Sequence, residues 1–479
     1  MPSLLSAGRL PPELWYRVFS HLPPKSLRAL IAFDPEFGGL VVPFLHVSID
    51  WRRYFDFLSD YSQSWADRRC SGTVRTVTLG ELDRRKPRRW SDDMAWDFTN
   101  TFSALSTFSN VGVLALVNVR YPVHQLPHHL ASMPSIRDIH LVFHNGCCAE
   151  TLPIGAVSRL ILPRTFPPLE YLEVRGLSRY QSLPQHTGFV HAGTAILAAV
   201  SCLPSIHTLD LDLHSWDSLV VGRSWLPGTS TLAPLLQHLQ LFRDASDEAH
   251  EVVTPGDWVK TFFNELSLVA ANLIHLHVVI GVEVHPPNDT PRLSFPLLVE
   301  VIGPYHMFPF LSFSGALRTL WVATVQCSTP RVEWSLSTAF APSCHILPLR
   351  SLSLLGWQPS ALPFHDLLAL CPHLTEVSLH LDSTQSFSTS DLAACGQALA
   401  TTSIARICIL GCKLSGSSME HVILSWKEWQ PSLVEARVSP TLCWTWGGGS
   451  LTTARLSYLQ PSVPAEYEVV YRLGSRYIP

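Results

Sequence analysis

Three histidines have the residue type and the spacing that could bind a metal ion. His275 and His277 are two residues apart, so both imidazoles would lie on one face of an extended strand. In aligned copies of a repeated pattern described below, His238 would lie beside His275 on the neighbouring strand. Imidazole is a common zinc ligand. The chain has 22 histidines, however, and no cysteine or carboxylate falls at a fixed ligand spacing, so we expect no metal and no cofactor.

No segment carries the local pattern of a known catalytic centre. The sequence contains no GxxxxGK[ST], GxSxG, HExxH or GxGxxG, which are the seeds of nucleotide, esterase, metalloprotease and dinucleotide sites. The adjacent Cys147 and Cys148, and Cys408 with Cys412, are interpreted as strand or core thiols. We therefore expect a protein that is not an enzyme.

Length and composition narrow the fold class and the partners. A single core stops growing beyond about 250–300 residues, so a chain of 479 residues indicates several domains or a repeat. A formal charge of −4 argues against bulk nucleic-acid affinity. Eleven scattered cysteines favour reduced thiols over a disulfide framework, and the first residues lack the pattern of a secretion signal. Asn272 interrupts the most apolar stretch, which is therefore too short to span a membrane. We expect an intracellular protein, in cytoplasm or nucleus, with no membrane or nucleic-acid partner.

Apolar residues at relative positions one, four and six recur in twelve segments, whose first positions are 25 to 44 residues apart. Positions four and six of a strand point to one side, and stacked copies can bury one another's apolar edges. The first positions are Val74, Val111, Ile136, Leu169, Ile206, Leu236, Leu273, Leu317, Leu349, Leu374, Ile404 and Leu433. Between these segments, apolar residues at helical spacing predict helices, in stretches that begin at Ser91, Gly193, Gly256, Phe364, Ser390 and Met419.

This LxxLxL spacing resembles the leucine-rich repeat. The copy that fits best has Ile404, Ile407, Ile409, Cys412 and Leu414 in the pattern LxxLxLxxCxL, while other copies lack the expected Asn or Cys. The resemblance implies an α/β fold with an irregular repeat solenoid over residues 74–440 and a C-terminal cap over 441–479. The alternative is that chance matches in a chain that is 47% apolar produce the series.

Positions three and five of each copy point away from the apolar edge and would line the exposed face of the sheet. Their mixture of polar residues with Tyr and Trp is typical of protein recognition, although any solvent-facing strand would also be polar. The residues predicted to contact a substrate protein are His140, Tyr171, Glu173, Asp210, His238, His275, His277, Trp321, Glu376 and Arg406.

The stretch LPPELWYRVFSHLPPKSLRALIAF at residues 10–33 predicts two short helices, over about 12–21 and 25–33. Leu14, Val18 and Leu22 recur at intervals of four, and Trp15 and Phe19 form a second stripe. Helices of this length are marginal alone, so something must cover them. They either cap the repeat or present one stripe to a partner.

These residues resemble the F-box, with its LPxEL start, an apolar pair one turn later and LPPKSL before the second helix. Asp34, Pro35 and Glu36 depart from the basic residues often found next. The resemblance implies an F-box over 9–50, after a tail of 1–8 and before a connecting segment of 51–73. It implies a substrate receptor of a cullin ubiquitin ligase, whose Skp-type adaptor would contact Leu10, Pro11, Leu14, Val18, Phe19, Leu22 and Leu27. The alternative is a stand-alone scaffold whose first helices only cap the repeat.

Overall fold

The computed structural model divides the chain into two compact units, Met1–Leu236 and Gln237–Pro479, and each is considered by itself. The structure describes residues 12–33, 41, 44, 48–51, 74–80, 105–117, 125–142, 151–153, 166–175, 189–191, 197, 200–201, 203–212, 215–216, 235–242, 262–264, 266–279, 292–313, 315–323, 348–357, 359–360, 362–381, 387–412, 416–439, 442–447 and 450–455.

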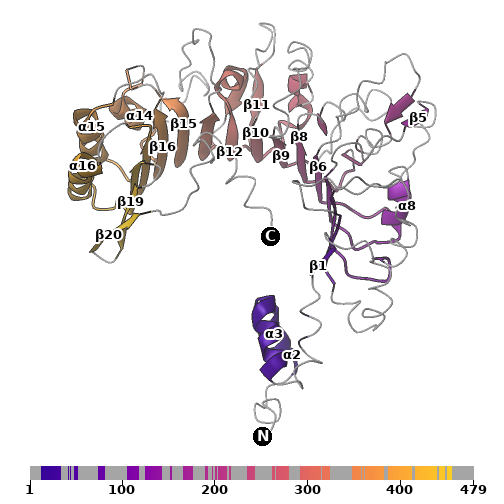
Figure 1. Ribbon diagram of the computed structural model, residues 1–479. Helices are drawn as coiled ribbons and strands as arrows, with labels where there is room; N and C mark the ends of the chain where they lie inside the picture. Colours follow the sequence, from indigo (N-terminus) through magenta and orange to yellow (C-terminus); the bar gives the residue numbers. More distant parts are fainter. Residues whose placement is uncertain are drawn as a thin grey trace, which may run out of the picture. The chain divides into compact units, whose positions relative to one another are not determined.

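The first unit contains a parallel sheet whose strands follow one another in chain order (Figure 1). Its strands are β1 (Ser48–Trp51), β2 (Thr76–Gly80), β3 (Val113–Val117), β4 (Asp138–Val142), β6 (Tyr171–Arg175) and β8 (Thr208–Asp212). Strands β5 (Thr151–Pro153) and β7 (Phe189–His191) form a separate antiparallel pair. The helices are α2 (Pro12–Ser20), α3 (Pro24–Phe33) and α8 (Leu126–Ala131).

The second unit repeats this arrangement and ends in an antiparallel hairpin. Its parallel strands are β9 (His238–Phe242), β10 (His275–Val279), β12 (Glu300–Pro304), β14 (Thr319–Ala323), β15 (Ser351–Trp357), β16 (Glu376–Leu381), β17 (Arg406–Leu410) and β18 (Glu435–Ser439). Antiparallel β19 (Leu442–Gly447) and β20 (Ser450–Arg455) follow. A small parallel pair, β11 (Leu293–Phe295) and β13 (Leu311–Phe313), flanks the 3-10 helix η5 (Tyr305–Phe310).

Burial confirms the repeat that the apolar spacing predicts. All twelve predicted first-position residues are at most 1% exposed. The residues at positions four and six are buried as well, for example Leu172 and Val174 in β6 and Ile407 and Ile409 in β17. Chance matches would not place every one of these side chains in the core. The chain therefore has a mixed α/β fold built on parallel strands in a repeated pattern of the leucine-rich type.

In most copies of the repeat, one backbone carbonyl accepts hydrogen bonds from two amides of the next copy. In β6, the amides of Glu170 and Tyr171 both donate to the carbonyl of Arg137, at 2.8 and 3.2 Å. The carbonyls that accept two amides of the next copy in this way include those of Arg75, Gly112, Glu170, Gln237, Ile274, Val299, Arg318, Arg350, Thr375 and Ala405. This shared acceptor fixes the register, so position three of one strand lies beside position three of the next.

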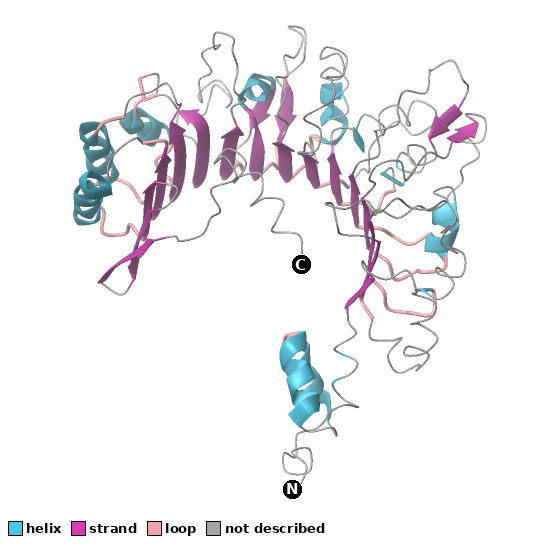
Figure 2. Ribbon diagram, viewed as in Figure 1, coloured by secondary structure: helices cyan, strands magenta, loops and turns pink. Residues whose placement is uncertain are grey.

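Three helices in the second unit confirm predictions from the sequence. They are α14 (Phe364–Leu370), α15 (Thr389–Leu399) and α16 (Gly416–Trp429), which lie on one side of strands β15 to β18 (Figure 2). In the segments predicted from Gly193 and Gly256, residues 197, 200–201, 262–264 and 266–269 are helical, whereas 203 and 270–272 are not. Most of the segment predicted from Ser91 lies outside the described residues. The two N-terminal helices also form, within one residue of the predicted bounds.

Two parallel strands were not expected. Strand β1 pairs with β2 and spans the predicted boundary between the F-box over 9–50 and the connecting segment of 51–73. Strand β12 lies between β10 and β14, in the 44-residue interval that is the longest of the predicted series. Its copy has buried Leu298 at position one and Val301 at position four but Gly303 at position six, so the apolar pattern is incomplete. A Cβ on Gly303 would lie 2.6 Å from Cε of Met307, the far end of a flexible side chain, which would have to shift.

Candidate interaction surfaces

The N-terminal helices enclose a small apolar core and leave one apolar stripe outside it. Phe19, Leu27 and Val41 are the buried centre, against which Trp15, Leu22, Leu30 and Phe44 pack. The rings of Trp15 and Phe19 stack with their centroids 5.5 Å apart. In the adjacent stripe of α2, Leu14 and Val18 are each 43% exposed and one helical turn apart.

This arrangement divides the seven predicted adaptor-binding residues into three groups. Leu14 and Val18 are on the surface, and Leu22 is half-buried. Phe19 and Leu27 are covered by their own helices, so in this state their part is to hold the helices together rather than to offer contact area. Leu10 and Pro11 lie outside the described residues.

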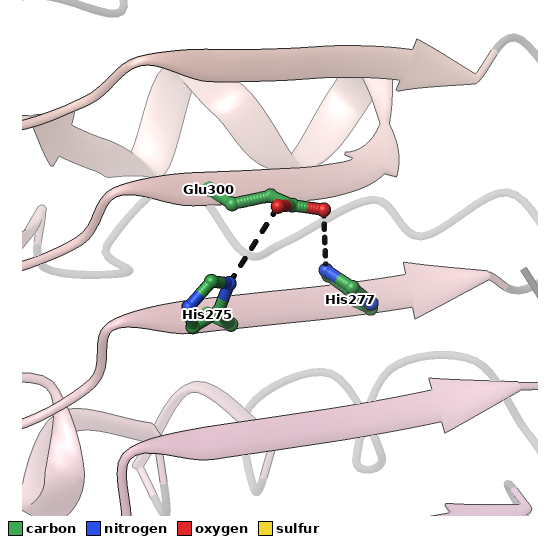
Figure 3. Close-up of side chains that lie close together, drawn as sticks. All are labelled: His275, His277 and Glu300. Atoms are coloured by element: carbon green, nitrogen blue, oxygen red, sulfur yellow. Dashed lines mark hydrogen bonds and ion pairs between the residues drawn. The ribbon is translucent and has the colours of Figure 1, made fainter. Parts of the chain in front are cut away.

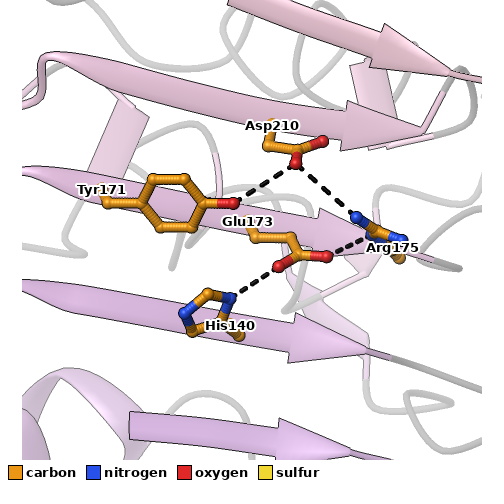
Figure 4. A network of polar contacts seen from close by, with 5 residues as sticks. All are labelled: His140, Tyr171, Glu173, Arg175 and Asp210. Atoms are coloured by element: carbon orange, nitrogen blue, oxygen red, sulfur yellow. Dashed lines mark hydrogen bonds and ion pairs between the residues drawn. The ribbon is translucent and has the colours of Figure 1, made fainter. Parts of the chain in front are cut away.

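A buried polar network occupies the position-three and position-five face of β4, β6 and β8 (Figure 4). Nδ1 of His140 lies 2.6 Å from Oε2 of Glu173, and the hydroxyl of Tyr171 donates to Oδ2 of Asp210 at 3.2 Å. Arg175 pairs with Glu173 and lies 3.6 Å from Asp210, so one guanidinium bridges two carboxylates. These side chains link three neighbouring strands, in addition to the backbone hydrogen bonds of the sheet.

The environment of this network shifts the pKa values of its members in different directions. Burial and the charge of Glu173 raise the pKa of Asp210 to about 7. Burial and the neighbouring carboxylates raise the pKa of Tyr171 above its ordinary value. Burial opposes ionisation of Glu173, but the hydrogen bond with His140 and the charge of Arg175 keep its pKa below the ordinary value. Oδ1 of Asp210 is buried without a hydrogen-bond partner among the described residues.

A second polar cluster occupies the equivalent face of β9, β10 and β12 in the second unit (Figure 3). The register pairs His275 with His238 on one side and with Glu300 on the other. The rings of His238 and His275 stack with centroids 4.5 Å apart and planes 13° apart. Glu300 lies 3.0 Å from Nε2 of His277 and 3.6 Å from Nδ1 of His275. These imidazoles lower the pKa of Glu300 to about 2.

A shallow hollow of about 230 Å³ lies on the same face between β14 and β18. Trp321 forms part of its wall, and Glu376 and Arg406 pair across it at 2.6 Å. Its other lining residues include Ser351, Ser353, Ser378, His380, Cys408, Glu435 and Arg437. Burial and the charge of Arg437 lower the pKa of His380 to about 4, so this imidazole is neutral at neutral pH.

The ten predicted substrate-contact residues thus fall into three local groups. His140, Tyr171, Glu173 and Asp210 belong to the network of the first unit, and the three predicted histidines belong to the cluster with Glu300. Trp321, Glu376 and Arg406 line the hollow. The prediction missed Arg175 and Glu300. Continuing the alternation to position seven would have found Arg175, whereas Glu300 required recognition of the incomplete β12 copy.

The comparisons with known proteins found matches among solved structures alone. No family model matches the sequence, and no curated protein matches it. Among solved structures, the chain is similar to the leucine-rich repeat-containing protein LegL7 from Legionella pneumophila, with 12% identity and a TM-score of 0.32 over 81% of this chain and 99% of that one. Such a low TM-score does not establish a common fold, so the repeat assignment depends on the burial and register above. No helix in the described part of the chain has the length and apolar character needed to cross a membrane.

Proposed function

We propose that this chain is a protein-interaction scaffold that acts as the substrate-recognition subunit of a Skp/cullin/F-box ubiquitin ligase. In this role α2 and α3 bind the Skp-type adaptor, and the exposed face of the repeat binds a substrate protein. The protein has no catalytic step of its own. It raises the local concentration of substrate lysines near a conjugating enzyme bound elsewhere in the complex.

The observation that carries the proposal is the division of apolar residues in α2. Phe19 is fully buried, whereas Leu14 and Val18 on the same helix are each 43% exposed. Two helices of nine and ten residues have little stability of their own, so apolar surface left in water is costly unless a second protein covers it. The exposed pair belongs to the stretch whose sequence resembles the F-box.

The repeat face supports the other half of the proposal. The polar network of the first unit, the histidine cluster and the hollow of the second unit all lie at positions three and five of their strands. Aromatic residues and arginine are enriched at protein–protein contact surfaces. Trp321 and Arg406 in the hollow are the residues whose types are most enriched at such contacts.

Binding to a purified Skp-type adaptor tests the proposal directly. We expect the chain to form a one-to-one complex with the adaptor in size-exclusion chromatography and calorimetry. The variant Leu14→Asp/Val18→Asp should bind more than about 100-fold more weakly, because two carboxylates without partners would become buried in the interface.

The matched control is Leu268→Asp/Leu297→Asp, which changes two apolar residues of similar exposure in the second unit. It should bind the adaptor with unchanged affinity. Hydrogen exchange over residues 12–33 should be the same in the adaptor-site variant and in the unchanged chain, which separates lost contact from lost folding. If the unchanged chain binds no adaptor, the ligase role is wrong and the stand-alone scaffold is the better interpretation.

A further inference from the structure

Among the described residues, His275, His277 and Glu300 form a group whose ligand atoms all lie within 4.8 Å of one another. Two features of the repeat produce this group. The two histidines alternate along β10 and therefore share a face, and the register places Glu300 of β12 directly opposite His275. Oε1 and Oε2 of one carboxylate face Nε2 of His277 and Nδ1 of His275, respectively (Figure 3).

We propose that these three side chains bind a divalent transition-metal ion, with Zn²⁺ as the preferred ion. Two imidazole nitrogens and one carboxylate oxygen are a ligand set that Zn²⁺ accepts, and a fourth position remains for water. The proposal is independent of adaptor binding, because its residues lie in the second unit and the adaptor site lies in α2.

The ligand atoms are close to the separations that four-coordinate geometry requires. Metal–ligand bonds of about 2.0–2.1 Å in a tetrahedron place ligand atoms about 3.3 Å apart. Oε1 of Glu300 lies 3.0 Å from Nε2 of His277, which is close to this value, whereas the 3.6 Å distance to Nδ1 of His275 is measured from the other carboxylate oxygen, Oε2. The three ligand atoms, one from each residue, lie within 4.8 Å of one another, so binding of one ion requires them to approach by up to about 1.5 Å.

The surroundings favour a formed site rather than a fluctuating one. The ring of His238 stacks on His275 and restricts its orientation. Leu276 and Val301, which alternate with the ligands on the same two strands, are fully buried and anchor the backbone. The ligand side chains are 31%, 18% and 28% exposed for His275, His277 and Glu300, so an ion from solution can reach them.

The alternative is a pair of histidine–glutamate ion pairs with no metal. Titration of the purified, metal-free chain with Zn²⁺ by calorimetry, and with Co²⁺ by visible absorption, distinguishes the two. We expect one ion per chain and the intense visible bands of four-coordinate Co²⁺. His277→Gln and Glu300→Gln should each weaken binding by at least about 100-fold, since removal of even outer-shell partners costs about 10–100-fold.

His238→Phe is the matched control, because it keeps the stacked ring and removes a neighbouring imidazole that is not in the proposed ligand set. It should change the affinity by less than about tenfold. Circular dichroism should be the same for all three variants, whose changed side chains are not in the core. Absence of saturable binding to the unchanged chain would overturn the proposal. So would an affinity of the His277→Gln and Glu300→Gln variants that equals the affinity of the unchanged chain. Loss of binding in His238→Phe would overturn the assigned ligand set.

Discussion

The contact between α15 and α16 predicts that Gly396→Ala destabilises the second unit. A Cβ at Gly396 would lie 2.1 Å from Cδ1 and 2.3 Å from Nε1 of Trp426, and 2.8 Å from the ring of Trp429. Carbon atoms pack at about 3.5–4.0 Å, so the buried indole would have to move by more than about 1 Å. That movement would also strain the hydrogen bond from Nε1 of Trp426 to the carbonyl of Leu392.

The net effect follows from two opposing terms. Replacing a helical glycine by alanine stabilises a helix by about 0.5–1 kcal/mol, whereas overpacking costs about 1–3 kcal/mol. Weakening the indole hydrogen bond adds about 1 kcal/mol to the cost. We therefore expect the free energy of local unfolding of α15 and α16 to fall by about 1–3 kcal/mol in Gly396→Ala.

Hydrogen exchange measured by mass spectrometry on peptides from 389–399 and 416–429 is the suitable assay, because repeat arrays need not unfold in one step. Ala394→Gly, at an exposed position of the same helix, gives the propensity term alone and should cost about 0.5–1 kcal/mol. Trp426→Leu should relieve the clash, so the double variant should be more stable than the sum of the single effects. If Gly396→Ala slows exchange in α15, the steric argument is wrong.

Three further predictions concern other parts of the chain. Phe19→Ala removes the centre of the small N-terminal core at a cost of about 3–5 kcal/mol. Backbone amides in peptides from 12–33 should then exchange completely, whereas Leu14→Ala should leave these amides protected. In the capping box of α15 the Ser388 hydroxyl accepts a hydrogen bond from the amide of Asp391. Ser388→Ala removes this bond and should lower the stability of the helix by about 1 kcal/mol, measured as faster hydrogen exchange in its first turn. Because the pKa of Asp210 is raised to about 7, its contribution to stability is present below about pH 4 and is lost as the pH rises through about 7. Thermal midpoints across this range should therefore depend less on pH in Asp210→Asn, and an unchanged slope would contradict the assigned pKa.

Most of the repeat could be predicted because its signal is local. An anchor such as Leu169 and the pair Leu172 and Val174 lie within six residues, and their spacing records which side of the strand is buried. The β12 copy could not be found in this way, since Gly303 stands at position six where the other copies have an apolar side chain. A copy without the full local pattern is recognised only from its place in the sheet, between β10 and β14.

The candidate sites were less accessible to sequence reasoning for the same reason. Glu300 is 23 residues from His277, and only the register of β10 and β12 makes them neighbours. The division between Phe19 and Leu14 also depends on tertiary packing, because both are apolar residues in one short helix and only the position of α3 and Phe44 decides which is covered. Periodicity identified the faces, and packing decided what each face contacts.

The shared register explains why polar clusters form at all on this sheet. Each strand places its third and fifth residues about 4.8 Å from their equivalents on the next strand, so the chemistry of a site is set by adjacent copies. Acidic Glu173 lies between His140 and Asp210, and Arg175 compensates for the second carboxylate. Acidic Glu300 lies opposite His275. Among the described residues, the basic groups within ion-pair distance of this carboxylate are the imidazoles of His275 and His277. The first arrangement is closed by its own counter-charge, whereas the second leaves two imidazoles facing one carboxylate, and this difference in local charge is the reason that the metal proposal concerns the second cluster and not the first.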